Sequence, residues 1–111
     1  MADKMCENNQ VTIMGEIVSD FTFSHEVYGE GFYMVQVSVN RLSNFVDYIP
    51  VMVSERLVDV KENAQGKYVY ITGQFRSFNR HEEHKNRLVL SVFVREFEIV
   101  EDVEEESAVN Q

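Results

Sequence analysis

The chain has 111 residues, of which 44% are hydrophobic, and it carries a net charge of −9. This length supports one folded domain with one core, and a single proline and five glycines exclude a low-complexity chain. The lone cysteine, Cys6, excludes an internal disulfide framework and fits a reducing compartment. No apolar run resembles a secretory signal or a membrane span, so we expect a cytoplasmic protein without membrane contact.

Residues 9–23 are rich in β-forming side chains and predict a long first strand, with Val11, Ile13 and Ile17 on one side. Gly15 shares that side. It predicts either the bend that a closed barrel needs at its corners or a close contact with a neighbouring strand. Residues 24–31 contain two glycines and predict a loop.

Two further strands follow, joined by a short turn. Residues 32–41 alternate, with Tyr33 and the valines 35, 37 and 39 on the inner side. Residues 42–44 predict a turn, so the strand at 45–53 is expected to pair back as a hairpin. Pro50 has no N–H to donate, which indicates an edge or a bulge in that strand.

The apolar period then changes to that of a helix. Over residues 54–65, Leu57, Val60 and Ala64 fall on one helical stripe. Ser54 is a suitable N-cap, and Gly66 is suited to end the helix. We therefore expect one short helix between the third and fourth strands.

The fourth strand is expected at 66–80 and the fifth at 87–100, separated by a polar loop at 79–86. In the fourth strand, the core side comprises Val69, Ile71, Gly73 and Phe75, and the opposite side comprises Tyr70, Thr72, Gln74, Arg76 and Phe78. In the fifth, the inner residues are Leu88, Leu90, Val92 and Val94. Val89, Phe93 and Phe97 lie opposite, where we expect partial cover by a subunit contact.

Three strands, one short helix and two strands form the element order of a five-stranded Greek-key OB-fold barrel. We therefore predict an all-β domain at residues 9–100, with the helix between strands 3 and 4. Residues 1–8 are expected to form a flexible N-terminus and residues 101–111 an acidic disordered tail.

Four segments resemble the bacterial single-stranded DNA-binding protein family over roughly residues 9–100. They are GKYVYITGQFR at 66–76, DYIPVMV at 47–53, NQVTIMGEI at 9–17 and VSVNR at 37–41. The resemblance implies an OB fold that assembles as a homotetramer, in preference to a homodimer, and coats unpaired DNA without strong sequence preference.

The chain also departs from that family. Tyr48 stands where the family often has a stacking tryptophan, Arg80 lies near another aromatic position, and the chain has no tryptophan. The glycine-rich linker is missing, and the chain ends in SAVNQ instead of an acidic tip closed by an apolar residue. The short form resembles proteins of phages, mobile elements or the related primosomal class.

Stacking on aromatic rings and neutralisation of phosphates are the expected means of binding. The candidate stacking residues are Phe32, Tyr48, Tyr70 and Phe78. The candidate phosphate or base contacts are Arg41, Arg76, Arg80, Lys85 and Arg87, with Asn40 and Gln74 as amide partners. The alternative is that the three residues Tyr48, Tyr70 and Phe78 pack against a neighbouring subunit, and that Arg80 and Lys85 pair with Glu82 and Glu83 in a solvated loop.

The net charge opposes contact with nucleic acid, but it is unevenly distributed. Six acidic residues cluster at 98–106, whereas residues 8–97 carry eleven acidic and nine basic side chains, a net charge of −2. The acidic tail is expected either to solvate the chain or to compete with DNA for the basic groove. It is also a weak candidate for docking replication or repair proteins.

No residue pattern indicates catalysis, a cofactor or a metal. His81 and His84 have two residues between them in an expected loop without a third ligand, whereas helical zinc motifs place three residues between the histidines. We therefore expect a non-catalytic protein that binds and protects single-stranded DNA in replication, recombination or repair. The alternative is a primosomal-type OB module that contacts proteins in a replication or DNA-transfer complex, with weak or no strand binding.

Overall fold

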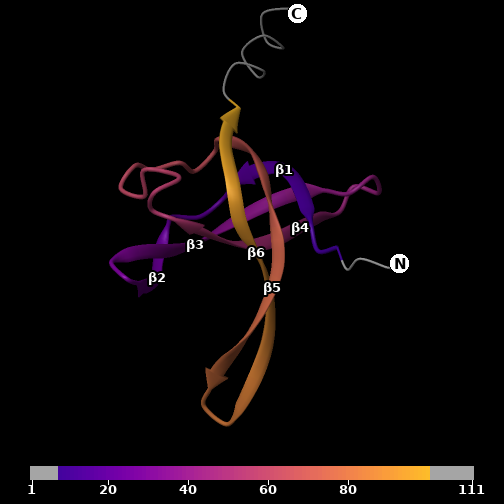
Figure 1. Ribbon diagram of the computed structural model, residues 1–111. Helices are drawn as coiled ribbons and strands as arrows, with labels where there is room; N and C mark the ends of the chain where they lie inside the picture. The colour runs from indigo at the N-terminus through magenta and orange to yellow at the C-terminus, as the bar shows by residue number, and fades with distance from the viewer. Residues whose placement is uncertain (1–7, 101–111) are drawn as a thin grey trace, which may run out of the picture.

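The computed structural model describes residues 8–100, apart from the side chains of Arg80 and Glu82. Six strands make up this part of the chain (Figure 1): β1 (Val11–Ile17), β2 (Thr22–Val27), β3 (Glu30–Asn40), β4 (Val46–Ser54), β5 (Tyr68–Glu82) and β6 (Lys85–Val100). The described residues contain no helix, and hence none that could cross a membrane. The expected tail at 101–111, Cys6 and most of the expected N-terminal segment lie outside the described residues.

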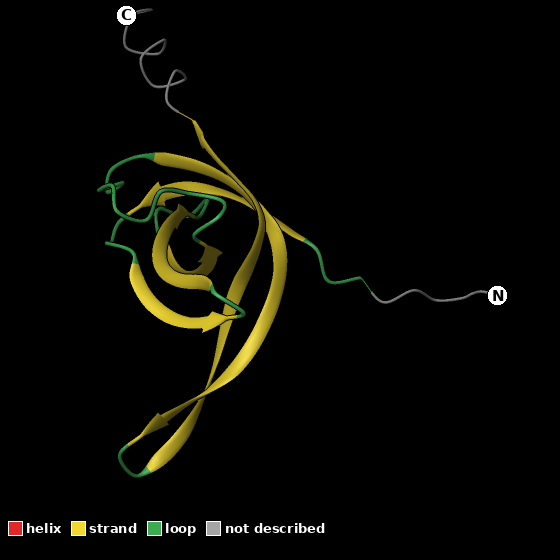
Figure 2. Cartoon of the chain, turned by 60° about the vertical axis from the view of Figure 1, so that its left-hand side comes forward, coloured by secondary structure: helices red, strands yellow, loops and turns green. Residues whose placement is uncertain are grey.

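The strands close into a curved ring around one core (Figure 2). Their order in the sheet is β1-β5-β6-β4-β3-β2, and β1 also pairs with β3 through Glu16↔Ser38 and Ile17↔Val37. β4 and β6 pair in parallel at Val51↔Val92, while the remaining pairings are antiparallel. The expected all-β barrel is confirmed.

The core is built from β-branched side chains on the inner faces of five strands. The fully buried members are Ile17, Val35, Val37, Val51, Val53, Val69, Ile71 and Val92. They alternate along each strand with outward residues, as the period of two requires. The inward faces predicted for β3, β4 and the first half of β5 are confirmed.

Two glycines allow strands to approach one another closely. A Cβ built at Gly73 would clash with the carbonyl oxygen of Phe93 and lie 2.9 Å from its carbonyl carbon. A Cβ at Gly15 would clash with the Ser38 carbonyl oxygen and lie 2.8 Å from Val37 Cγ1. Gly15 therefore marks the close contact where β1 closes onto β3, and Gly73 marks the contact of β5 with β6.

The predicted helix at 54–65 is wrong, because these residues form successive turns. Ser54 does cap a turn, since its Oγ accepts from Arg56 N at 3.0 Å. The side chains of Asp59 and Asn63 then accept from the backbone two residues later, at Lys61 N (3.0 Å) and Gln65 N (3.1 Å). Such local side-chain bonds compete with helical hydrogen bonds and favour turns.

Both expected loops, at 24–31 and 79–86, are largely strand. β2 and β3 form a hairpin whose turn residues, Tyr28 (φ 51°) and Gly29 (φ 82°), have the two positive φ values of a type I′ turn. β5 and β6 pair as far as Glu82↔Lys85, so only residues 83 and 84 separate them. Polar side chains did not prevent pairing, because each strand supplies the other's backbone hydrogen bonds.

A bulge in β6 changes which of its side chains face the core. Thr72 pairs with Glu96 but Gly73 pairs with Val94, so Arg95 is an extra residue. Phe97 consequently packs against the core, whereas the sequence predicted it on the outer face. Beyond the pairing of β6 with β4 at Val51↔Val92, the β5–β6 hairpin extends past the barrel as a two-stranded arm (Figure 1).

The close contact at Gly73 makes this glycine a stability test. Gly73→Ala places a methyl group against the β6 backbone and should lower the free energy of unfolding by about 1–3 kcal/mol or more. Urea denaturation measures the change. Gly31→Ala is the matched control, because its Cβ would meet only side-chain atoms of Glu55 and Tyr33, no closer than 3.1 Å. Equal effects of the two substitutions would contradict the assigned contact.

Candidate nucleic-acid interface

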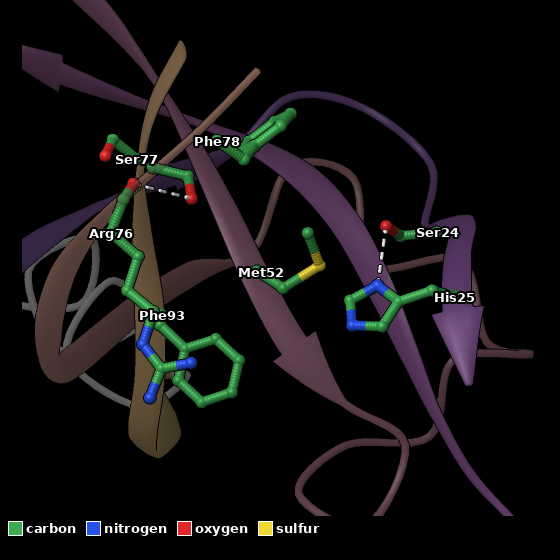
Figure 3. Close-up of a pocket in the computed structure, with 8 residues that line it drawn as sticks. Ser24, His25, Met52, Arg76, Ser77, Phe78 and Phe93 are labelled. Atoms are coloured by element: carbon green, nitrogen blue, oxygen red, sulfur yellow. Dashed lines mark hydrogen bonds between the residues drawn. The ribbon is translucent and has the colours of Figure 1, made fainter. Parts of the chain in front are cut away.

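A groove on the outer face of the barrel lies between the two hairpins. One hollow, of about 320 Å³, is lined by Ser24, His25, Met52, Arg76, Ser77, Phe78, Ser91 and Phe93 (Figure 3). A second, of about 360 Å³, is lined by His25, Val27, Tyr28, Glu30, Phe32, Arg56, Arg76 and Phe93. Because the two share His25, Arg76 and Phe93, we treat them together as the outer groove.

Four flat side chains form a continuous line across this groove. The guanidinium carbon of Arg76 lies 4.0 Å from the centroid of the Phe93 ring. The Phe93 and Phe32 centroids are 5.6 Å apart, and the Phe32 and His25 rings stack at 5.1 Å with an interplanar angle of 14°. We call Arg76, Phe93, Phe32 and His25 the aromatic line. It offers π-faces and a cation within one concave surface.

Strand register and two bulges place the line. Phe93 pairs with Gln74, and Arg76 is two residues farther along β5. Arg76 is therefore the diagonal neighbour of Phe93 on the same face of the sheet. In β2, a register shift between Phe23 and His25 brings His25 opposite Phe32. Met52 of β4 lies on the floor between the two sides, almost fully buried (Figure 3). The aromatic line therefore depends on two β-bulges, which a strict alternation of inward and outward residues would not predict.

Arg76 is held over Phe93 by neutral partners. With the Gln74 amide oriented so that its oxygen faces Arg76, that oxygen accepts from Nη2 at 3.0 Å and from Nε at 3.1 Å. Among the side chains that the structure describes, no carboxylate forms an ion pair with Arg76. The guanidinium thus keeps its positive charge facing the groove, in a fixed orientation.

The structure brings together four of the predicted site residues: Phe32, Gln74, Arg76 and Phe78. Tyr48 is exposed on the same face of β4 as Met52, about 13 Å farther along at the usual strand rise. Tyr70 is also exposed, but it lies six residues along β5 from Arg76 and pairs with Met14 and Glu98. Tyr70 therefore lies apart from the groove.

The remaining predicted residues lie at the two ends of the sheet. Asn40 is exposed at the end of β3, opposite Val46. Lys85 and Arg87 are exposed on the arm, where Arg87 pairs in register with Arg80. The lining of the outer groove does not include these positions.

Arg41 is an ion-paired residue in this structure. Its Nε donates to both carboxylate oxygens of Asp47, at 3.1 and 2.9 Å, and its Nη2 donates to Oδ1 at 2.8 Å. The hydrogen bond and the charge of Asp47 raise the pKa of Arg41, and the same hydrogen bond lowers the pKa of Asp47. The positive charge of Arg41 is therefore largely compensated where it stands.

Sequence reasoning named neither His25 nor Phe93 as a site residue. His25 lies in an expected loop. Phe93 was placed on the outer face, where partial cover by a subunit contact stays a prediction. The alternation of β6 did place Phe93 on the outer face, so that signal was available. For His25 the bulge at Ser24 removes any regular pattern.

No metal centre comes together in the described part of the chain. Within it, no group of three or more His, Cys, Asp or Glu side chains could hold an ion. The His81 ring nitrogen Nδ1 instead lies 2.7 Å from Asn86 Oδ1, across the arm.

Comparison with solved structures identifies the fold. The N-terminal domain of the PriB protein from Thermoanaerobacter tencongensis, solved as a dimeric structure, is 42% identical, with a TM-score of 0.71. The match covers 85% of this chain and 98% of that one. The Plasmodium falciparum SSB complex with ssDNA has the same TM-score at 13% identity, covering 88% and 99% of the two chains.

These likenesses define the class as OB-fold proteins, which confirms the predicted fold. At 42% identity over nearly the whole PriB domain, the chain belongs to the SSB-like family that includes PriB. No protein-family model matches the chain, and no curated protein matches it.

The Arg41–Asp47 pair can be tested by titration. The Asp47 carboxyl should titrate below the usual aspartate range, and Arg41→Ala should return its pKa upward. Because the folded-state pKa is lowered, the stabilisation from this exposed pair is present above the unfolded-state pKa and is lost as the pH falls through the folded-state value. Carbon-13 NMR of the carboxyl group measures the shift. Arg56→Ala should leave it unchanged, and identical titration of Asp47 in all three proteins would refute the pairing.

Proposed function

We propose that this protein binds and protects single-stranded DNA in its outer groove, largely without sequence preference and without catalysis, during replication, recombination or repair. The observation that carries the proposal is Arg76, stacked on Phe93 and held by the neutral Gln74 amide, in a groove that also exposes Phe32 and Phe78. The fold shared with an SSB that was solved in complex with ssDNA supports it.

The chemistry of the groove suits unpaired nucleotides. Every base has a π-face, and stacking on an aromatic side chain contributes about 1–3 kcal/mol per base. Each phosphate that a cation neutralises on a single strand adds roughly −0.7 to the log–log dependence of affinity on salt. Arg76 can supply both effects, since its guanidinium is planar as well as charged. Duplex DNA hides its base faces, so this groove favours the single strand.

The acidic composition does not prevent this mode of binding. Repulsion by the whole-chain charge is screened within about 10 Å at 0.1 M ionic strength. Contacts in the groove act at 3–5 Å, where the local arrangement of charge decides. We propose that residues 9–100 form the binding domain and that the acidic segment at 101–111 flanks it.

Phe78 and Phe75 provide a matched pair for testing this proposal. Both belong to β5 and are similarly exposed, at 37% and 41%, but they lie on opposite faces of the strand. Phe78→Ala should weaken binding of a fluorescently labelled oligo-dT by about 1–3 kcal/mol, because Phe78 lines the groove. Phe75→Ala should leave the affinity unchanged.

Titration at two salt concentrations completes the experiment. Wild-type binding should weaken steeply with salt, and Arg76→Gln should both weaken binding and flatten that dependence. Equal losses from Phe78→Ala and Phe75→Ala would remove the groove from the mechanism. Absence of any binding at low salt would overturn the proposal as a whole.

A second candidate function is a protein-interaction OB module of primosomal type in a replication or DNA-transfer complex. The net charge of −9 and the absence of tryptophan favour it. It predicts no strand binding at low salt, so the same titration separates the two functions.

We also propose that the protein self-associates through the inner face of the arm. Leu88 and Leu90 are 70% and 56% exposed there. Apolar surface of this kind usually marks a contact site. The related PriB domain was solved as a dimeric structure, which supports a dimer as the basic unit. The homotetramer expected from the sequence stays a prediction.

Charged substitutions on the arm test this surface. Leu88→Asp combined with Leu90→Asp should raise the dissociation constant of the oligomer at least tenfold, because association would bury two carboxylates. Sedimentation velocity over a concentration series measures it. Leu42→Asp is the control, since Leu42 is fully exposed on the distant β3–β4 turn. If the double variant sediments like the wild type, the interface lies elsewhere.

A further inference from the structure

The outer groove contains a carboxylate that the proposed function does not use. Among the described side chains that line it, Glu30 is the acidic one. Glu30 begins β3, directly after the β2–β3 turn, and its side chain is 27% exposed. A groove that binds phosphates gains nothing from a negative charge, so the presence of Glu30 needs a different explanation.

Neighbouring side chains hold the Glu30 carboxylate in one orientation. Its Oε2 accepts a hydrogen bond from the hydroxyl of the buried Ser54. Its Oε1 lies 3.7 Å from Arg56 Nε, a longer ion pair. A carboxylate can accept about four hydrogen bonds, so each oxygen keeps a free acceptor site. These free sites belong to a side chain that lines the same hollow as Phe32 and Arg76.

The hollow beside Glu30 has the size and surfaces that one base requires. Its volume of about 360 Å³ exceeds that of a single nucleobase, and its walls include the stacked Phe32 and His25 rings. Arg76 lies in the same lining and can attract a flanking phosphate, whereas Arg56 is paired with Glu30. A carboxylate repels phosphate but accepts hydrogen bonds, so it suits the donor edge of a base.

We propose that Glu30 selects guanine at this one position of the bound strand. A carboxylate only accepts hydrogen bonds, and guanine presents two adjacent donors, N1–H and the N2 amino group, that match its two oxygens. Adenine and cytosine present one amino group beside an acceptor nitrogen. Thymine presents one N–H between two carbonyl oxygens, which the carboxylate repels. The order of preference is therefore guanine first and thymine last.

This inference rests on the proposed function and refines it. Stacking and phosphate contacts bind most of the strand regardless of sequence, while the hollow beside Glu30 recognises one base. A strand that can slide will settle with a guanine in that hollow. A single guanine in a run of thymines is therefore enough to reveal the preference.

Competition between synthetic oligonucleotides tests the inference on the full chain. A dT oligomer with one central guanine should bind about tenfold more tightly than the all-thymine strand. Inosine at that position lacks the N2 amino group and should lose most of the gain. A 7-deazaguanine keeps both donors and should bind as guanine does. These comparisons use the wild-type protein, so they do not depend on the folding of any variant.

Two variants assign the effect to Glu30. Glu30→Gln keeps an acceptor for Ser54 but removes the negative charge, and it should reduce the guanine preference to less than twofold. Glu26→Gln removes the same charge from the exposed Glu26, which pairs with Gly31 in the same hairpin but does not line the hollow. It should keep the tenfold preference.

The outcomes separate this inference from the proposed function. Equal binding of the guanine-containing and all-thymine strands by the wild type overturns the inference and leaves strand binding intact. Retention of the preference in Glu30→Gln also overturns it. If no oligonucleotide binds at low salt, the proposed function itself is refuted, and the inference with it.

Discussion

The pairing of β5 with β6 is the interaction on which the rest of the structure depends. It runs from Tyr68↔Val100 to Glu82↔Lys85, with one irregularity at Thr72 and Gly73. Its first half supplies Val69 and Ile71 to the core, and Val92 and Val94 join them just beyond the irregularity. Its second half leaves the barrel and forms one wall of the outer groove. The bulge between the two halves decides that Phe97 faces the core and Phe93 faces the groove. A single ladder of backbone hydrogen bonds thus connects the stability of the barrel with the shape of its binding surface.

Much of the barrel follows from local patterns in the sequence. Alternating valines and isoleucines predicted the inner faces. Gly15 predicted either a bend or a close strand contact, and the structure shows the contact. The error at residues 54–65 has a local cause. Asp59 and Asn63 stabilise turns through side-chain hydrogen bonds to the backbone, and the spacing of apolar residues does not reveal such bonds. Residues 24–27 of β2 and the tip of the arm at 81–86 were missed for another reason. Their polar residues predicted loops. These residues are extended because each segment pairs with a neighbouring strand.

The candidate site was predicted less completely than the fold. Phe32, Gln74, Arg76 and Phe78 could be found because each lies on the outward phase of a strand. The aromatic line as a whole could not, since two bulges set the relative positions of His25, Phe32 and Phe93. The ion pair of Arg41 was also not predicted. Its partner Asp47 is six residues away in the sequence, and the two side chains come into contact only when β3 and β4 pair. Arg41 and Arg76 look alike in the sequence, yet Arg41 pairs with Asp47, whereas no described carboxylate pairs with Arg76.

The arm is a ribbon of two strands whose only anchorage is at its root. Ribbons of this kind are marginal in isolation, and their resistance to opening falls with distance from the support. That root lies where β6 pairs with β4 at Val51↔Val92 and Met52↔Phe93, just beyond Gly73. Bending of the arm beyond this root would shift Ser77 and Phe78, which line the outer groove, without moving the buried valines of the core.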